Sequence, residues 1–418
     1  MSELSEKIAS LSPEQRAVFD LKLKALKAKK QQAPKAEPPK IIRQTVDGPL
    51  PLSLDQERLW FINQFAPENA AYNIHTATRL IGNLDMAVLE KSFNAVIQRH
   101  DVLRTSFVAE NGQPKQVIAP SLQLSIPIID LQHLSQAEQD AEAMRHASEE
   151  AEAPFDLSQA PLMRVWLLKM SLTEHVLYFN QHHIITDWWS AKLLFQEMAT
   201  FYEALLSGQL PVLPEPYQYK DFVLWERERV ENQDMARSLA YWRKHLAEGT
   251  FQLDLPIAHR RPVEQTFGGR RQWVTIPPGL AHDLKAFSRR ENVTLFITLT
   301  AAFKMLLFRY TGQTDITLGT PLANRSQVEL ERVLGFLITM LVLHTDLSGA
   351  LSFKELVHKV RQVILEAYAH QDVPFAKILE IVQLARDWSR NPIFQFSFIF
   401  IDEFYYRTDS LNRFRIDI

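Results

Sequence analysis

The chain has 418 residues, with 46 Lys and Arg against 49 Asp and Glu and a hydrophobic content of 46%. This length predicts two to three folded domains, and the balanced charge leaves no single-sign field to attract nucleic acid or an anionic membrane. The absence of cysteine excludes disulfides, thiolate metal sites and cysteine nucleophiles. Because we find neither a secretory leader pattern nor an uncharged apolar run of about 18 residues, we expect a cytoplasmic protein.

The first thirty residues are predicted to form a separate helical element, because a narrow apolar stripe is followed by an N-cap signature at residues 12–15. This element, residues 1–30, either lies on the main body or serves as a docking or linker element for a partner chain. Residues 31–48 are rich in proline and poor in apolar side chains, which predicts a semi-extended linker.

The remaining chain alternates helix-like and strand-like segments irregularly, which indicates a mixed α/β fold. We place an N-terminal lobe at 49–225 and a C-terminal lobe at 226–418. The apolar periodicity predicts strands over 163–170 and 174–185, and helices over 83–99, over 187–206 and within 279–310, where Leu295, Leu299, Phe303 and Leu306 fall in register.

The stretch NQHHIITDWWS, residues 180–190, concentrates chemistry-bearing side chains at the junction of a predicted strand and helix. On a strand, His182 and His183 point to opposite faces, so they make a poor metal chelate, and no third ligand follows at a known spacing. One imidazole can act as a base near neutral pH while the other is buried and holds the strand end. Asp187 either caps the following helix or pairs with a buried arginine.

Further segments, taken together, resemble the motifs of the condensation domains of nonribosomal peptide synthetases. The resemblance covers roughly residues 48 to 400, with the motifs in the family's order and spacing. The segments are LSLDQERLWFINQFAPENAAYNI from Leu52, RHDVLRTSF from Arg99, HHIITDW from His182, YTGQTDITLGTPLANR from Tyr310, GFLITMLVL from Gly335, HQDVPFAKILE from His370 and RDWSRNPIFQ from Arg386.

This resemblance implies two chloramphenicol-acetyltransferase-like lobes that form a V-shaped pseudo-dimer with a central tunnel. An acyl or peptidyl donor would arrive on the phosphopantetheine arm of an upstream carrier protein, expected on another polypeptide. An aminoacyl acceptor would arrive on a downstream carrier, and its amine would attack the donor thioester to form an amide. The resemblance also implies an adjacent adenylation domain, a monomeric chain, and no cofactor or metal bound by the chain itself.

Carried over to this sequence, the resemblance makes His183 the catalytic residue, either as the base that accepts the amine proton or as the group that orients the amine and stabilises the intermediate. His182 would support the strand, and Asp187 would pair with an arginine. We expect Arg325 to be that partner, with Arg58 as the other buried-arginine candidate. Further tunnel-lining or supporting positions are Trp188, Tyr310, Gly335 and Thr339.

The sequence departs from the family pattern most clearly at Trp188, where the family has glycine. Three outcomes are open: a narrowed donor site, a rearranged but active turn, or a closed centre. Thr339 in place of asparagine and Asn324 in place of glycine are milder changes. After SFIFIDEF the chain runs for only a few more residues, whereas family members continue with strands and a helix that complete the second lobe.

These departures keep a second hypothesis open, in which a catalytically impaired condensation-like module serves as a carrier-docking or recruitment scaffold. A third candidate is a free-standing acyltransferase that uses a soluble acceptor. Retention of both histidines and Asp187 favours the amide-forming enzyme, because a scaffold has no need of that set of side chains.

Overall fold

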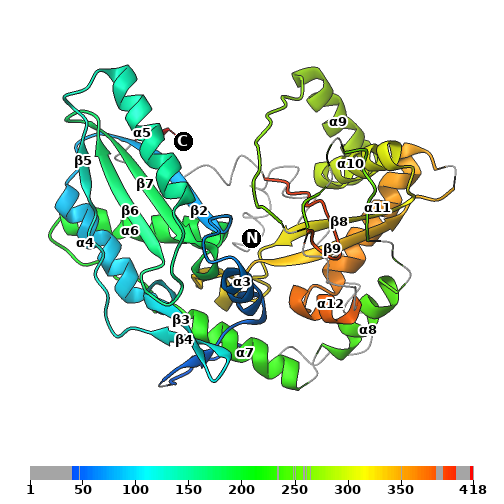
Figure 1. Cartoon of the computed structure of the whole chain (residues 1–418), viewed down its shortest axis with the longest axis horizontal. Helices are drawn as coiled ribbons and strands as arrows, with labels where there is room; N and C mark the ends of the chain where they lie inside the picture. The colour runs from blue at the N-terminus through cyan, green and yellow to red at the C-terminus, as the bar shows by residue number, and fades with distance from the viewer. Residues whose placement is uncertain are drawn as a thin grey trace, which may run out of the picture. The chain divides into compact units, whose positions relative to one another are not determined.

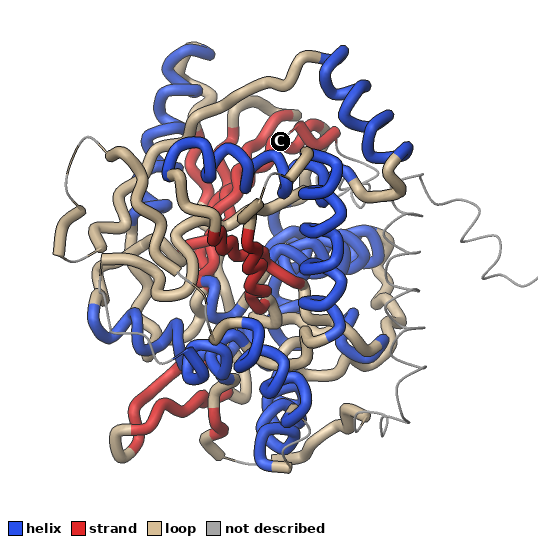
Figure 2. The backbone as a smooth tube through the Cα atoms, turned by 90° about the vertical axis from the view of Figure 1, so that its right-hand side faces the viewer, coloured by secondary structure: helices blue, strands red, loops and turns tan. Residues whose placement is uncertain are grey.

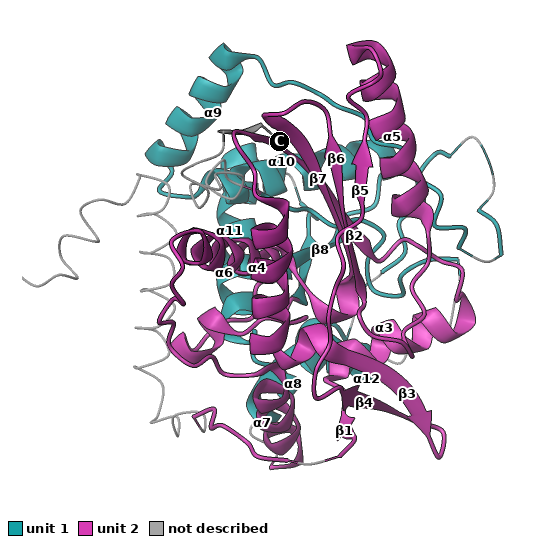
Figure 3. Ribbon diagram, turned by 90° about the vertical axis from the view of Figure 1, so that its left-hand side faces the viewer, with its two compact units in different colours: residues 1–38, 233–322, 339–400 teal, residues 39–232, 323–338, 401–418 magenta. Residues whose placement is uncertain are grey.

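The structure is a computed structural model that describes residues 40–401, apart from 47, 233, 234, 248, 250, 258, 260, 264, 350 and 383–388, together with the backbone of 415–417. The predicted helical element at 1–30 and most of the linker at 31–48 lie outside the described residues. The described residues fall into two compact units (Figure 3). Unit 1 lies within Gln233–Leu322 and Thr339–Phe400, and unit 2 lies within Pro39–Asn232, Ala323–Ile338 and Ile401–Ile418.

A single break at 225/226, as the sequence predicted, does not describe this division. Helix α7, Tyr219–Glu231, runs through that point and belongs to unit 2. Residues 323–338 connect two strands of unit 1 but belong to unit 2, where their apolar side chains join the core. The sequence did not reveal this because the order of residues along a connection gives no sign of which core its side chains enter.

Unit 2 is built on a mixed five-stranded sheet (Figure 1). All neighbouring strands are antiparallel except β5 and β6. In spatial order the strands are β10 (Arg415–Asp417), β2 (Asn73–Ile81), β7 (Glu174–His182), β6 (Met163–Lys169) and β5 (Ile128–Asp130).

Helices cover both faces of this sheet, since successive side chains of a strand point to opposite sides. On one face Phe179 of β7 packs against Phe93 of α4 (Met86–Arg99) and Phe195 of α6 (Trp188–Leu206), with ring centroids 6.0 and 5.2 Å apart. On the other face the Tyr178 hydroxyl donates to the Ala147 carbonyl of α5 (Gln136–Glu152) at 3.0 Å. The histidine-bearing strand is therefore central in its sheet and packed on both sides.

The rest of unit 2 surrounds the carboxyl end of β7. The motif RHDVLRTSF is explained here, because the buried His100 ring lies 2.7 Å from the Glu197 carboxylate of α6. The other elements are β1 (Leu50–Pro51), α3 (Leu54–Phe65), the 3₁₀ turn η1 (Asp101–Arg104), β3 (Thr105–Glu110), β4 (Gln113–Ile118), η2 (His183–Ile185) and η3 (Val328–Arg332); β1, β4 and β3 form a small antiparallel sheet in that order.

Unit 2 also begins earlier than the predicted residue 49. Ile41 is 2% exposed and belongs to the hydrophobic core. The Gln44 amide donates to the Asp221 carboxylate at 2.8 Å, and the Arg43 guanidinium lies over the Tyr217 ring. One apolar anchor among polar and proline residues was too weak a pattern to mark the start of the unit.

Unit 1 contains an antiparallel pair of strands and several helices (Figure 2, strands in red and helices in blue). Gly319 of β8 also forms an isolated parallel bridge with Ser397. The described elements are α8 (Ala236–His245), α9 (Pro278–Arg290), α10 (Leu295–Thr311), β8 (Asp315–Leu322), β9 (Thr339–Asp346), α11 (Phe353–Ala369) and α12 (Phe375–Val382).

Within the described ranges, no single helix has both the length and the apolar content needed to cross a membrane. The pair α9 and α10 meets that test only when taken together, and the two helices bend by 108° at their break.

The predicted register of α10 was wrong. Leu306, expected on the buried face, is 49% exposed, whereas the fully buried positions include Ile297, Ala301 and Lys304. The Lys304 ammonium donates to the carbonyls of Ile316 in β8 and Leu343 in β9, at 2.9 and 2.5 Å. Sequence reasoning treated this lysine as a surface residue, but its backbone acceptors allow its head group to be buried.

Burial of Lys304 predicts a pH-dependent stability. Burial lowers the pKa of Lys304 from 10.5 to about 7, so between these values the unfolded chain holds a proton that the folded chain has lost. Stability therefore rises with pH across this window. We expect urea denaturation to show a gain of about 2 kcal/mol between pH 7 and pH 9 that disappears in Lys304→Met. The exposed Lys285→Met is the control, and an equal gain in both variants would contradict the prediction.

Candidate active site

The two histidines lie where strand β7 turns into a 3₁₀ segment. The strand predicted over 174–185 ends at His182, and residues 183–185 form η2. The Ile184 amide donates to Nδ1 of His182 at 3.1 Å, and the Ile184 carbonyl accepts a hydrogen bond from Gln56 Nε2 at 2.9 Å. A histidine and a glutamine of the opening motif thus fix the turn from its two sides.

His182 is buried among aromatic rings. Tyr72 and Phe155 lie with ring centroids 6.4 and 6.2 Å from its imidazole. Because Nδ1 accepts the Ile184 amide hydrogen, the proton of the neutral ring sits on Nε2. Burial, and secondarily the charge of His183, lowers the pKa of His182 to about 3. At neutral pH this ring is therefore an uncharged element of the turn.

His183 presents the opposite tautomer. Its Nδ1 lies 2.6 Å from the Thr186 carbonyl oxygen, which can only accept, so Nδ1 carries the proton and Nε2 carries the lone pair. Burial lowers the pKa of His183 below 6.5; the Thr186 contact and the charge of Asp187 oppose that shift, and the charge of Arg58 adds to it. At pH 7 the ring is a neutral imidazole with a basic Nε2.

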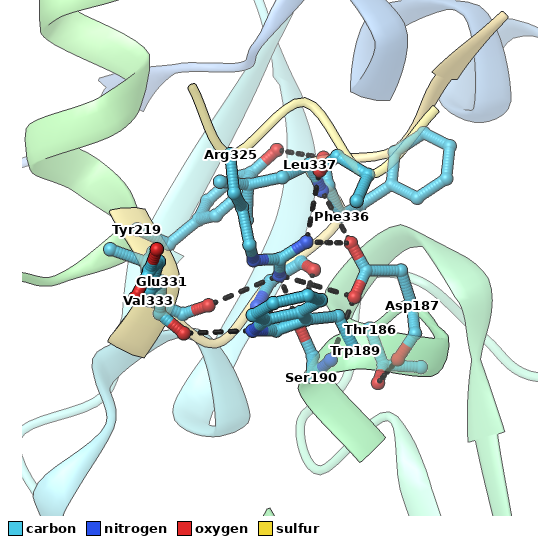
Figure 4. Close-up of polar contacts among 12 residues, drawn as sticks. Thr186, Asp187, Trp189, Ser190, Tyr219, Arg325, Glu331, Val333, Phe336 and Leu337 are labelled. Carbon is cyan, nitrogen blue, oxygen red and sulfur yellow. Dashed lines mark hydrogen bonds and ion pairs between the residues drawn. The ribbon is translucent and has the colours of Figure 1, made fainter. Parts of the chain in front are cut away.

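Asp187 both caps α6 and pairs with Arg325, so the two roles left open by the sequence occur together. Its carboxylate accepts the Ser190 amide at 2.8 Å and the Leu337 amide at 3.1 Å. Arg325 makes a two-pronged contact, with Nη1 3.0 Å from Oδ2 and Nη2 3.1 Å from Oδ1 (Figure 4). Both side chains are 2% exposed, and the pairing with Arg325 is as predicted.

The hydroxyl of Ser190 ties residue 335 to the start of α6. It donates to the Gly335 carbonyl at 2.8 Å and accepts from the Gly335 amide at 3.0 Å and from Arg325 Nη2 at 2.8 Å. Gly335 has φ +151, and a Cβ atom there would overlap the ring of Tyr219. The Tyr219 hydroxyl in turn donates to the Phe336 carbonyl at 2.8 Å. Residues 335–337 are therefore held from both sides (Figure 4).

Sequence reasoning missed Ser190 and Tyr219. Ser190 had a signal, since it stands three residues after the capping Asp187, but a serine there also fits an ordinary first helical turn. No local signal marks Tyr219, because its contact with Phe336 joins residues 117 positions apart.

Trp188 is the first residue of α6, with a 51% exposed side chain. It is absent from the described residues with positive φ, so this position does not require glycine. Its neighbour Trp189 donates from Nε1 to the Glu331 carbonyl at 2.8 Å and lies beside the Arg325 guanidinium. The backbone thus accommodates the tryptophan pair without strain at this turn.

The predicted residues divide between the units. His182, His183, Asp187, Arg325 and Gly335 gather in unit 2, and the half-buried Arg58 of α3 is close enough to influence the charge of His183. Two of the other predicted positions lie in unit 1: Tyr310 on α10 is 63% exposed, and Thr339 begins β9, where its hydroxyl accepts the Phe375 amide at 3.2 Å.

Among the residues that the structure describes, no group of three or more histidine or carboxylate side chains is arranged to hold a metal ion. The two histidines of the site each direct Nδ1 to the backbone, His182 to Ile184 and His183 to Thr186.

Solved structures share this fold. The X-domain of teicoplanin biosynthesis, solved in complex with OxyB, has a TM-score of 0.77 at 28% identity and covers 87% of this chain and 80% of that one. The starter condensation domain of rhizomide synthetase has a TM-score of 0.72 at 24% identity, over 84% of this chain and 78% of that one. The fold is that of the condensation class of acyltransferases.

The model of the condensation-domain family matches residues 46–416, and the chain belongs to this family of amide-forming acyltransferase domains. A linear gramicidin synthase of Brevibacillus parabrevis is 42% identical over 354 residues, 84% of this chain. Phosphinothricin tripeptide synthetase PhsC of Streptomyces viridochromogenes is 35% identical over 403 residues, 96% of this chain. The chain spans only 5% and 37% of these two relatives.

Proposed function

We propose that the chain joins a donor acyl or peptidyl group, held as a thioester on an upstream carrier, to the amine of an aminoacyl group on a downstream carrier. The observation that carries the proposal is the tautomer of His183. Its Nδ1 is committed to Thr186, which leaves a neutral ring with its lone pair at Nε2. Family membership supplies the reaction class.

In this reaction the acceptor nitrogen attacks the donor thioester carbon, the carbon–sulfur bond breaks, and the pantetheine thiol leaves. The amine loses one proton in all, and the thiolate gains one. Nε2 of His183 either takes the amine proton and passes it to the sulfur, or holds the amine by a hydrogen bond while charge develops. Both roles require an uncharged ring, and burial together with the charge of Arg58 keeps the pKa of His183 low.

The phosphopantetheine arms belong to the carriers and supply the thioester bond. Relatives of which this chain spans 5–7% are large synthetases, which supports placing it beside carrier and adenylation domains. The upstream carrier then sits on another polypeptide, and the chain works as a cytoplasmic monomer.

The second candidate is a scaffold that docks carriers or recruits another enzyme. One observation favours it: the X-domain that shares this fold was solved bound to OxyB. The exposed Trp188 and Trp189 side chains supply apolar surface for such a contact.

A loaded-carrier assay separates the two candidates. The chain is mixed with one carrier bearing a donor thioester and a second bearing an aminoacyl thioester, and intact-protein mass spectrometry follows the second carrier. We expect the mass of the donor acyl group to appear on the acceptor carrier only when the chain and both loaded carriers are present. No transfer, with carrier binding retained in a pull-down, would reject the enzyme and leave the scaffold.

We further propose that the Trp188 indole shapes the donor site, because it stands next to Asp187 at the start of α6. Trp188→Gly is expected to widen the range of donors or raise their turnover by severalfold, since a large half-exposed ring is removed. Measuring rates with short, long and branched donors checks this, with Trp188→Phe as the matched control. Equal rates in the parent and Trp188→Gly for every donor would dismiss the idea.

A further inference from the structure

The orientation of the His183 ring depends on more than one contact. The hydrogen bond from Nδ1 to Thr186 fixes one point of the imidazole, but a single such bond leaves the ring plane free to rock about it. The second contact is with Phe336, whose ring meets the imidazole edge to face, with centroids 4.8 Å apart and planes at 71°. Edge-to-face packing at this separation is a favoured arrangement of two aromatic rings.

Phe336 is itself held by three neighbouring anchors. The Tyr219 hydroxyl donates to its carbonyl, the Ser190 hydroxyl bonds both backbone groups of Gly335, and the Asp187 carboxylate accepts the Leu337 amide. The Phe336 side chain is 4% exposed, so it cannot swing into solvent without opening this network. Every backbone contact that the Asp187–Arg325 pair organises at residues 335–337 thus converges on the residue that touches the imidazole.

We propose that Phe336 is the positioning residue of the active site: its ring sets the plane of the His183 imidazole and so aims Nε2. On this view the ion pair of Asp187 and Arg325 acts on catalysis through Phe336. This inference rests on the proposed amide-forming function, but its structural half can be observed without turnover.

Phe336→Leu tests the proposal, because leucine keeps an apolar side chain in the buried site and removes the aromatic face. We expect kcat for amide formation to fall about 10- to 100-fold, with the KM values for both loaded carriers nearly unchanged. The matched control is Phe93→Leu, which truncates another buried phenylalanine of the same core, packed against Phe179 rather than His183. Its kcat per folded molecule should equal that of the parent.

Imidazole NMR of histidine-labelled protein reports the ring directly, with His183 assigned from its absence in His183→Gln. We expect one sharp His183 signal in the parent and in Phe93→Leu, and a broadened or doubled signal in Phe336→Leu. An unchanged line shape in Phe336→Leu overturns the proposal, whether or not kcat falls, as does an unchanged kcat in an active enzyme. If the parent forms no amide with any loaded carrier, the proposed function fails, while the line shape still decides whether Phe336 orders the ring.

Discussion

His183→Ala is expected to lower kcat for amide formation by about 10²- to 10⁴-fold, the usual contribution of a positioned proton-transfer group. The reason is local: Nε2 of His183 carries a lone pair because Nδ1 is bonded to Thr186, whereas the buried His182 uses its own lone pair to hold the turn. The loaded-carrier assay measures the loss, with the exposed His133→Ala as a control that should match the parent. Activity within threefold of the parent would remove His183 from the chemistry.

The pH profile of the parent adds an independent check. Burial lowers the pKa of His183 below 6.5, so the neutral form needed for the reaction persists as the pH falls through 6.5. We therefore expect kcat to stay level from pH 8 to below 6.5 and to decline only at lower pH. A decline that begins above pH 6.5 would indicate either a raised pKa or a different essential group.

The second large effect is expected at Arg325. In Arg325→Met, the Asp187 carboxylate remains buried beside two backbone amides but loses both guanidinium contacts. Breaking a buried ion pair by removing one partner typically costs about 3–5 kcal/mol, and we expect a loss of this size in urea denaturation.

Asp187→Asn provides the matched partner for a double-mutant cycle, since asparagine can still cap α6. In the double variant no uncompensated charge is left, so the combined loss should be smaller than the sum of the two single losses. Additive losses would show that Asp187 and Arg325 do not stabilise each other.

Much of the site was predictable from the sequence because its parts lie in short segments. The strand before His182, the helix after Asp187 and the pairing of Asp187 with Arg325 all followed from the periodicity and the family motifs. The end of the strand did not follow, because HHII fits the pattern of a buried strand. What ends it is a side-chain contact, the bond from the Ile184 amide to His182.

Other features depend on tertiary packing that the sequence does not encode locally. The register of α10 was misjudged because Lys304 reaches backbone carbonyls on two strands far along the chain. Tyr219 and Phe336 could not be linked, since neither flanking sequence hints at the other. The assignment of residues 323–338 to unit 2 was equally hidden.

That excursion of the chain between β8 and β9 limits how such domains can be recombined. A chimera joined once, near residue 232, would combine residues 39–232 from one parent with an Arg325 and a Gly335 from another, and the foreign strap would have to match the resident Ser190 and Tyr219. Exchanges that carry residues 323–338 along with the first segment keep these partners from a common parent. Engineered hybrids should therefore be spliced at two additional junctions, one on each side of this strap, rather than at the apparent midpoint of the chain.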